Sequence, residues 1–371
     1  MMKKILTLIL VVMLMAALTA CGTEKTDDDV KVLPKEKDNE LKVLEVDELH
    51  NGRANDISSD GKKILFSWDE DKEDPEPRDE MGPPSHLYTL NLDDLSLTKM
   101  SNAEYFQSFA NYSPDGEKIV FLEGVEGIFT PYIMDNKPNA EKKSILQKDH
   151  PFASPNISWS PDGNLFALIT WGGANQIIGL YDQQGNLQKS IKSEKNQSLM
   201  NVTFYDNENI IYFVGDVTGK TPNHIAVKNI NDKEPAQKIV NALGTYAISP
   251  DKQRLAYIQN SDPNSDAPNI LKIDALGTDF NTGSTLTEVE VGHTVKMAWS
   301  PNSKYLVYSD NDKIWALNPE TNDKKQLISN MYVITNVMWL NNEEVIFNGI
   351  PNEDKKGDFS ETIKMYRIKL K

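Results

Sequence analysis

The stretch Trp159-Ser160-Pro161-Asp162-Gly163, followed by the apolar run Leu165 to Ile169, decides the fold of this chain. The aromatic residue ends one expected strand, Ser-Pro-Asp-Gly forms a tight turn, and the apolar run forms the next strand. Proline presets φ at the second turn position, Ser and Asp bond to nearby backbone amides, and Gly suits the last position of a type I turn. The stretch therefore predicts a β-hairpin.

The same pattern recurs along the 371-residue chain. We number each copy by its anchor, the apolar residue before the turn, and the seven anchors are Ile57, Tyr112, Trp159, Phe204, Ile248, Trp299 and Trp339. The copies at 112, 159, 248 and 299 keep Ser-Pro followed by Asp or Asn, the copy at 57 is looser, and those at 204 and 339 lack the proline. The steps between anchors are 55, 47, 45, 44, 51 and 40 residues. A repeat of this length with several short strands is typical of a four-stranded propeller blade.

Each hairpin is followed by a third expected strand, at His86 to Leu92, Pro131 to Asp135, Gln176 to Tyr181, Ile225 to Ile230, Ile270 to Leu276, Lys313 to Leu317 and Lys364 to Leu370. Six of these precede a short polar fourth strand, such as Ser96 to Met100, but the seventh does not. The segment Leu41 to Asp47 is expected to supply that strand and to bury most of Leu41, Val43, Leu44 and Val46. The sequence thus predicts an all-β, seven-bladed propeller whose closed ring leaves no long exposed sheet edge.

The Ser-Pro-Asp-Gly-x-x-apolar repeat resembles the TolB-type β-propeller repeat, a relative of the WD40 unit, over residues 41–371. The resemblance implies a propeller that binds a protein partner in the bacterial cell envelope, without naming that partner. It is a specific signal for the fold and a weak one for function, because propellers host unrelated activities.

Residues 1–20 are typical of a bacterial signal peptide. Lys3 and Lys4 precede an apolar run, Ile5 to Leu18, that is too short to span a membrane as a helix. The following Leu18-Thr19-Ala20-Cys21 resembles a lipobox, which implies that Cys21 becomes the N-terminus and carries lipid. An ordinary secretory signal with an incidental cysteine and an uncleaved anchor are the alternatives. Cys21 is the only cysteine, so no internal disulfide can form.

Residues 21–40 are charged and lack apolar periodicity, which predicts a lipidated cysteine followed by a disordered tether. The lipid would hold the propeller, residues 41–371, at the extracytoplasmic face of the membrane. We expect a monomeric ring whose partner is an envelope protein or peptide. The net charge of −16 argues against nucleic acid as a partner.

The motifs of common enzyme classes are missing from the sequence. It has no Gly-x-Ser-x-Gly elbow, no His-Glu-x-x-His, no Cys/His zinc spacing and no phosphate-binding glycine loop. The five histidines, at 50, 86, 150, 224 and 293, fall in different blades. The acidic insertion Asp69 to Pro84 superficially resembles an EF-hand loop but lacks its sixth-position glycine and contains prolines, which favours a solvated loop. We therefore expect no cofactor, no metal and no catalytic residue.

The innermost strand of each blade should border the central channel. The residues three positions before the anchors are Ala54, Phe109, Asn156, Asn201, Thr245, Lys296 and Asn336. Those two positions before are more apolar and should pack between blades: Asn55, Ala110, Ile157, Val202, Tyr246, Met297 and Val337. The candidate channel-lining residues are accordingly Asn156, Asn201, Thr245, Lys296 and Asn336. Either a ligand or ordered water is compatible with such side chains, and the anchor aromatics are expected in the core.

Three classes of function remain open. The leading interpretation is a non-enzymatic scaffold that binds an envelope protein or peptide. The alternatives are an envelope lyase or lactonase-type enzyme that uses channel residues, and a lipoprotein that binds a solute or glycan. Converging acid, base or metal-binding groups at one channel mouth would favour the enzyme, whereas an apolar patch at the rim would favour protein binding.

Overall fold

The computed structural model describes residues 41–69, 85–102, 105–125, 128–145, 149–150, 152–172, 175–260, 268–292, 295–333, 337–352 and 363–371. Cys21 and the rest of residues 1–40 lie outside this part. Residues 41–371 form one compact unit. Within the described ranges, no helix has the length and apolarity needed to cross a membrane.

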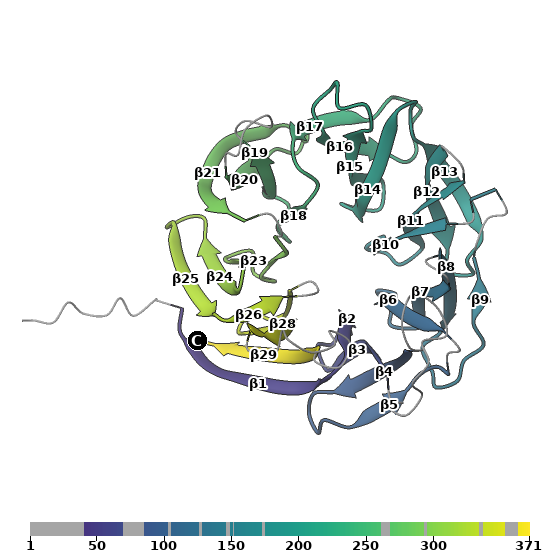
Figure 1. The fold of residues 1–371 in the computed structure, drawn as a ribbon. Coiled ribbons are helices and arrows are strands. Elements are labelled where there is room, and N and C mark those ends of the chain that lie inside the picture. Colours follow the sequence, from purple (N-terminus) through teal and green to yellow (C-terminus); the bar gives the residue numbers. More distant parts are fainter. Residues whose placement is uncertain are drawn as a thin grey trace, which may run out of the picture. The chain divides into compact units, whose positions relative to one another are not determined.

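The unit is a ring of seven blades, which confirms the predicted all-β propeller (Figure 1). In six blades the strands follow chain order from the centre outward. In order, these blades consist of β2 (Arg53–Ile57), β3 (Lys63–Trp68), β4 (His86–Asn91) and β5 (Leu97–Lys99); β6 (Phe106–Tyr112), β7 (Lys118–Val125), β8 (Ile128–Asp135) and β9 (Lys143–Ser144); β10 (Phe152–Trp159), β11 (Leu165–Gly172), β12 (Asn175–Asp182) and β13 (Leu187–Lys192); β14 (Gln197–Phe204), β15 (Asn209–Asp216), β16 (His224–Asn229) and β17 (Gln237–Asn241); β18 (Tyr246–Ile248), β19 (Arg254–Asn260), β20 (Asn269–Leu276) and β21 (Thr282–Val291); β22 (Met297–Trp299), β23 (Leu306–Asp310), β24 (Lys313–Asn318) and β25 (Asp323–Ile328).

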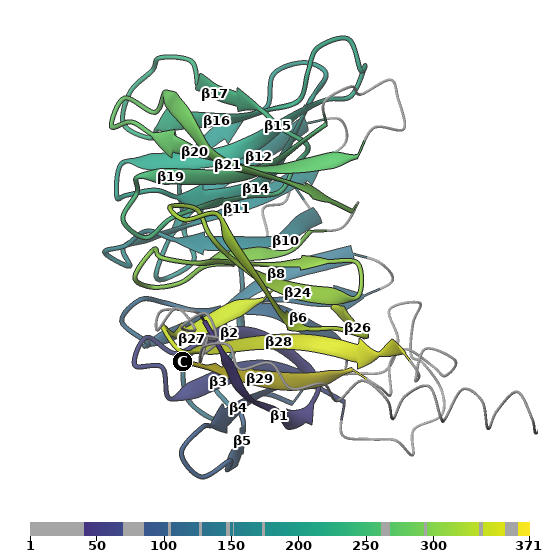
Figure 2. The ribbon, with the colours of Figure 1, turned by 90° about the vertical axis from the view of Figure 1, so that its left-hand side faces the viewer.

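The seventh blade is completed from both ends of the unit. Its sheet combines β26 (Met331–Val333), β27 (Met338–Asn341), β28 (Glu344–Pro351) and β29 (Lys364–Leu370) with β1 (Val43–Asn51). β1 and β29 lie side by side in both ribbon views (Figure 1 and Figure 2) and pair antiparallel. The predicted closure of the ring by the N-terminal strand is therefore confirmed.

Ion pairs join β1, the strand that closes the ring, to β29. Glu45 pairs with Lys369 at 2.6 Å and Glu48 with Lys364 at 2.9 Å. Leu44 and Val46 are exposed and Leu41 and Val43 are only half-buried, so the expectation that most of these four side chains are buried was wrong. The register shift between Val43 and Glu45 is a bulge in β1, and a bulge changes which side chains face the neighbouring sheet.

The repeated turn has one hydrogen-bond pattern. In blade 3, Ser160 Oγ donates to Asp162 Oδ1 at 2.7 Å, and the amides of Leu165 and Gly163 donate to Ser160 Oγ and O at 3.0 and 2.9 Å. The φ of Gly163 is 70°, in the left-handed region where glycine carries no steric penalty. The serine therefore bonds both to the turn, through Gly163 N, and to the start of the next strand, through Leu165 N. These two bonds explain why a serine recurs at this position in the blades.

The core lies between neighbouring blades, not inside one. One apolar cluster joins Ile169 and Leu180 of blade 3 to Val202 and Tyr212 of blade 4. The anchors Tyr112, Phe204 and Trp299 are buried, while Trp159 and Trp339 are half-buried and pack against such clusters. From the apolar column, Ala110, Ile157, Val202 and Val337 are buried as expected.

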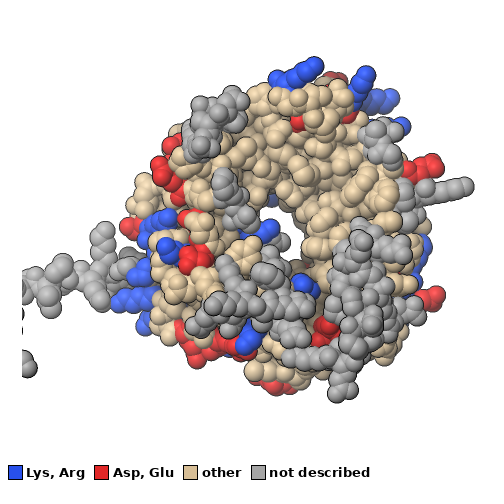
Figure 3. Space-filling model, in the orientation of Figure 1, with Lys and Arg blue, Asp and Glu red and all other residues tan. Residues whose placement is uncertain are grey.

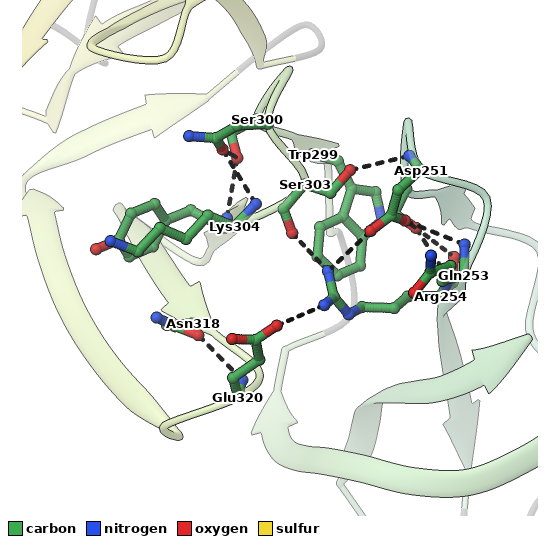
Figure 4. A network of polar contacts seen from close by, with 12 residues as sticks. Asp251, Gln253, Arg254, Trp299, Ser300, Ser303, Lys304, Asn318 and Glu320 are labelled. Atoms are coloured by element: carbon green, nitrogen blue, oxygen red, sulfur yellow. Dashed lines mark hydrogen bonds and ion pairs between the residues drawn. The ribbon is translucent and has the colours of Figure 1, made fainter.

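Polar contacts also tie neighbouring blades together. Trp299 Nε1 and Trp339 Nε1 each donate to a carbonyl oxygen of the preceding blade at 3.1 Å. At the turn end of blades 5 and 6, the Arg254 guanidinium donates to Ser303 O at 2.8 Å and to Glu320 at 2.6 Å (Figure 4). These bonds fix the spacing of the blades, and hence the width of the channel.

Candidate functional site

The innermost strands surround an opening at the centre of the ring (Figure 1). The space-filling view shows this opening with Lys and Arg side chains at its edge (Figure 3). Residues of the inner strands that keep accessible surface are therefore the candidates to meet a ligand in the channel.

The predicted channel residues differ in their environment. Asn156, Thr245 and Lys296 are half-buried and Asn201 is exposed, while Asn336 lies outside the described residues. Asn156 Oδ1 is buried without a hydrogen-bond partner, whereas Asn201 Nδ2 donates to Gly244 O at 2.8 Å. The four described residues, one from each of four blades, thus range from half-buried to exposed, and their place in the channel stays a prediction.

Two β-bulges interrupt the pairing of inner strands. The pairing of β6 with β7 shifts register between Ser108 and Asn111, and that of β14 with β15 shifts between Met200 and Thr203. Phe109 and Asn201 within these bulges have left-handed φ values of 53° and 52°.

Phe109, inside the bulge of β6, is 37% exposed, and Met200, which pairs with Phe213 just before the bulge of β14, is 40% exposed. Pro155 on the inner strand of the intervening blade 3 is also exposed. On blade 2, the Phe109 ring meets Phe129 edge-on at 5.5 Å, and the adjacent Ile128 is 38% exposed. We call Phe109, Ile128, Phe129, Pro155 and Met200 the apolar rim.

A further column of inner-strand residues precedes the anchors by one position, and its members Ala247, Ala298 and Met338 pack against the core clusters. The residues of this column are Asp56, Asn111, Ser158, Thr203, Ala247, Ala298 and Met338, and all seven are half-buried. They are polar in blades 1 to 4 and apolar in blades 5 to 7. Sequence reasoning missed this set because it examined only the columns two and three positions before the anchors, although the same counting would have found it.

Asp56 is the carboxylate of this column. Its Oδ2 accepts from the amide of Tyr112 in the next blade at 2.8 Å, and its Oδ1 accepts from Ile57 N at 2.8 Å. In blade 3, Ser158 Oγ makes the equivalent bond to Phe204 N at 2.9 Å. Although part of the residue is accessible, protein surrounds the carboxylate closely, and this desolvation raises the pKa of Asp56 to about 6 against the lowering effect of the two amides. Asp56 is therefore a link between blades that titrates near neutral pH.

Replacing Asp56 with Ser, the residue that blade 3 uses, is expected to remove a pH dependence. A carboxyl group with a raised pKa in the folded state stabilises most below its unfolded pKa and loses that contribution as pH rises toward 6. The melting temperature of Asp56→Ser minus that of the parent should therefore increase between pH 4 and pH 7. The matched control is Asp60→Ser, because bonds from Ser58 Oγ and Lys62 N lower the pKa of Asp60. Its contribution is lost only as pH falls below the unfolded value of 3.8, so the difference for this variant should be nearly constant between pH 4 and pH 7. A pH-independent difference for Asp56→Ser would contradict the raised pKa.

The histidines and the acidic insertion were the other candidates for a binding site. His50 packs edge-on against Trp68 at 4.6 Å, and His293 lies outside the described residues. Among the described residues, no group of three His, Cys, Asp or Glu side chains could hold a metal ion. Of the acidic insertion, only Asp69 is described, so the structure does not test it.

No family model and no curated protein matches the chain. An oligogalacturonate lyase from Vibrio parahaemolyticus superposes with a TM-score of 0.64 at 12% identity, covering 89% of this chain and 98% of its own. The β-propeller domain of the Trilobed protease from Pyrococcus furiosus, described as having an open velcro topology, gives 0.60 at 12% identity, covering 87% and 95%. A protein provisionally named TolB from Agrobacterium tumefaciens gives 0.43 at 19% identity, covering 66% and 82%. At 12% identity, the first two similarities show that this chain shares the β-propeller fold.

Proposed function

We propose that the protein is a lipid-anchored, monomeric scaffold on the extracytoplasmic face of a bacterial membrane, and that its propeller binds a protein or peptide without catalysis. The observation that carries this proposal is the apolar rim. Phe109 and Met200 are large apolar side chains that remain exposed on inner strands otherwise packed into the core. Exposed apolar side chains that gather on one surface are typical of interaction sites, and we propose that the rim residues form such a surface.

The surroundings of the rim suit an extended segment with apolar side chains. Arg53, at the start of the inner strand of blade 1, lies with its guanidinium 5.4 Å from the Phe106 ring, and Lys296 is a predicted channel residue of blade 6. Aromatic and arginine side chains dominate the binding energy of many protein interfaces. The rim would hold apolar side chains of the partner while these cations attract its carboxylates.

Charged substitutions in the rim are expected to abolish partner capture. In Phe109→Glu/Met200→Glu, two carboxylates would have to be desolvated against an apolar partner, which should weaken binding by about tenfold or more. Photo-crosslinking from position 155 in intact cells, followed by identification of the adduct, measures capture. The matched control is Leu95→Glu/Val217→Glu, because these residues are 51% and 66% exposed on other strand connections. Equal adduct formation in both variants would exclude the rim as the binding surface.

One observation favours an enzyme as the second candidate. Asp56 has a pKa of about 6, which suits a general base at neutral pH, and it stands in the polar half of the column that precedes the anchors by one position. A lyase would use such a base to remove a proton, and one structural neighbour is an oligogalacturonate lyase. Both Asp56 oxygens already accept main-chain amides, however, and this supports a structural role.

A substrate screen separates the two candidates. Purified protein is tested against acidic oligosaccharides and lactones, with Asp56→Ser and Lys296→Ala as variants. The scaffold proposal expects no turnover with any of the proteins. Turnover by the parent that either variant abolishes would replace the scaffold with the enzyme, and saturable sugar binding without turnover would favour a solute- or glycan-binding lipoprotein.

A further inference from the structure

A pocket of about 250 Å³ lies in blade 4, and none of the apolar-rim residues lines it. Three segments form it: the start of β14, the end of β15 and the connection from β15 to β16. Gln197, Gly215 and His224 represent these segments in the lining. The pocket is therefore a feature of one blade and does not depend on the channel.

The connection between β15 and β16 is held in place by its own hydrogen bonds. The Asp216 carboxylate accepts from the amides of Thr218 and Thr221 at 2.8 and 2.7 Å, and from their hydroxyls at 2.7 and 2.8 Å. Val217 N donates to Asn196 O at 3.0 Å, which ties the connection to the approach of β14. The wall of the pocket is thus formed before any ligand arrives, which lowers the entropy cost of binding.

The charges in the lining favour an anion. Lys195 and Lys220 line the pocket, and within the part of the chain that the structure describes their ammonium groups make no ion pair or hydrogen bond, although Lys220 N donates to Asp216 Oδ2 at 3.1 Å. Asp216 is the lining's carboxylate, but the bonds from Thr218 and Thr221 engage its oxygens and hold its pKa well below the usual range. Desolvation lowers the pKa of His224, so its ring is neutral at pH 7. Its Nδ1 lies 3.4 Å from Pro222 O and carries the one N–H, which leaves Nε2 as an acceptor. Two ammonium groups without an ion pair among the described residues thus belong to the lining of this pocket, in a protein whose net charge is −16.

The neighbouring carboxylate does not cancel these charges. Glu194, beside Lys195 in the chain, is outside the lining and accepts a hydrogen bond from Gln197 Nε2 at 3.3 Å. Lys238, which faces His224, adds positive charge from β17. Counting Lys195, Lys220 and Lys238 against the carboxylates of Asp216 and Glu194, the formal charge around the pocket is +1, and a positive concave site concentrates small anions.

We propose that this pocket binds a small organic anion, bearing a carboxylate or a phosphate, of the size of a single sugar ring. Its volume of about 250 Å³ lies just below the roughly 300–1,000 Å³ usual for ligand sites, which limits the occupant to one ring. Lys195 and Lys220 would contact the anionic group, and the Asn196 side-chain amide as donor and His224 Nε2 as acceptor would meet its remaining polar atoms. The site is independent of the proposed scaffold function.

Calorimetric titration of the full chain tests the site with three probes that share one ring. These are glucose 6-phosphate, glucuronate and neutral glucose, at pH 7 and low salt. We expect one or both anions to bind and glucose not to bind, and the stronger anion identifies the preferred group. Lys195→Gln/Lys220→Gln should weaken that binding by about tenfold or more, because charge-assisted hydrogen bonds to the anion are lost.

Two variants serve as controls for the anion titration. Lys233→Gln, at an exposed position of the same blade outside the pocket, and Phe109→Glu/Met200→Glu in the apolar rim should both bind the anion as the parent does. The proposal is overturned if neither anion binds at millimolar concentration, if glucose binds equally well, or if the double lysine variant retains the affinity of the parent. A loss of partner capture in the rim variant with intact anion binding would show that the two sites act separately.

Discussion

Deleting residues 41–46 is expected to lower the melting temperature of the propeller by roughly 10 °C. The deletion removes the pairing of Val43, Glu45 and Val46 with β29 and the two main-chain bonds between Lys42 and Lys371. It also uncovers a β29 edge that includes the buried Ile368 and Leu370. The lost hydrogen bonds and apolar contacts together correspond to about 3 kcal/mol or more, a large part of the net stability of a domain. Thermal unfolding followed by circular dichroism provides the measurement.

Side-chain variants test how much each face of the closing strand β1 contributes to stability. Leu41 and Val43 pack against the core of blade 7, whereas Leu44 and Val46 are 61% and 41% exposed. Leu41→Ser/Val43→Ser should therefore destabilise the ring, while Leu44→Ser/Val46→Ser should change its stability by less than about 0.5 kcal/mol per residue. If the deletion melts like the parent, or if both pairs of substitutions behave alike, the closing strand does not stabilise the ring as argued.

The repeat was sufficient to predict the blades because each unit carries its own local signals. The third strand of blade 7 was expected at Lys364 to Leu370, and β29 has these bounds. The third strand of blade 2 begins at Ile128, three residues before the expected Pro131. Proline lacks an amide donor, which makes it a natural choice for a strand start, yet within β8 it pairs opposite Leu122. Tertiary pairing here overrides the local preference.

The residues that line the channel were harder to predict than the blades, because the lining depends on which side chains of each inner strand face the channel. Counting back from the anchors assumes that side chains alternate between the two faces of the strand at every residue. A bulge inserts an extra residue and breaks that alternation. The bulges at Phe109 and Asn201 have no clear sequence signal, since a left-handed φ is uncommon for a bulky residue such as Phe. Counting back from the anchors therefore put Phe109 in the same column as the predicted channel residues, but it could not show that Met200, one position before that column, is exposed.

Cys21→Ser is expected to move the protein from the membrane fraction to the soluble fraction, the largest change of any single substitution considered. The prediction rests on the lipobox-like Leu18 to Cys21, which lies outside the described residues. Serine has no thiol to receive lipid, and each methylene of a buried acyl chain contributes about 0.8 kcal/mol to membrane binding. Fractionation of cells followed by immunoblotting measures the shift, and Thr23→Ser, two residues beyond the cysteine, is the matched control.

Mass spectrometry of the same fractions distinguishes the three interpretations of the N-terminus. With lipidation, the parent lacks residues 1–20 and carries added lipid mass, and Cys21→Ser leaves the membrane fraction. With an uncleaved anchor, both proteins keep residues 1–20 and stay in the membrane fraction, because the apolar run Ile5 to Leu18 holds them there. With an ordinary secretory signal, the parent itself is soluble and has no added mass. Membrane retention of Cys21→Ser would therefore exclude an anchor that depends on this cysteine, while leaving the closed propeller unaffected, because β1 begins at Val43.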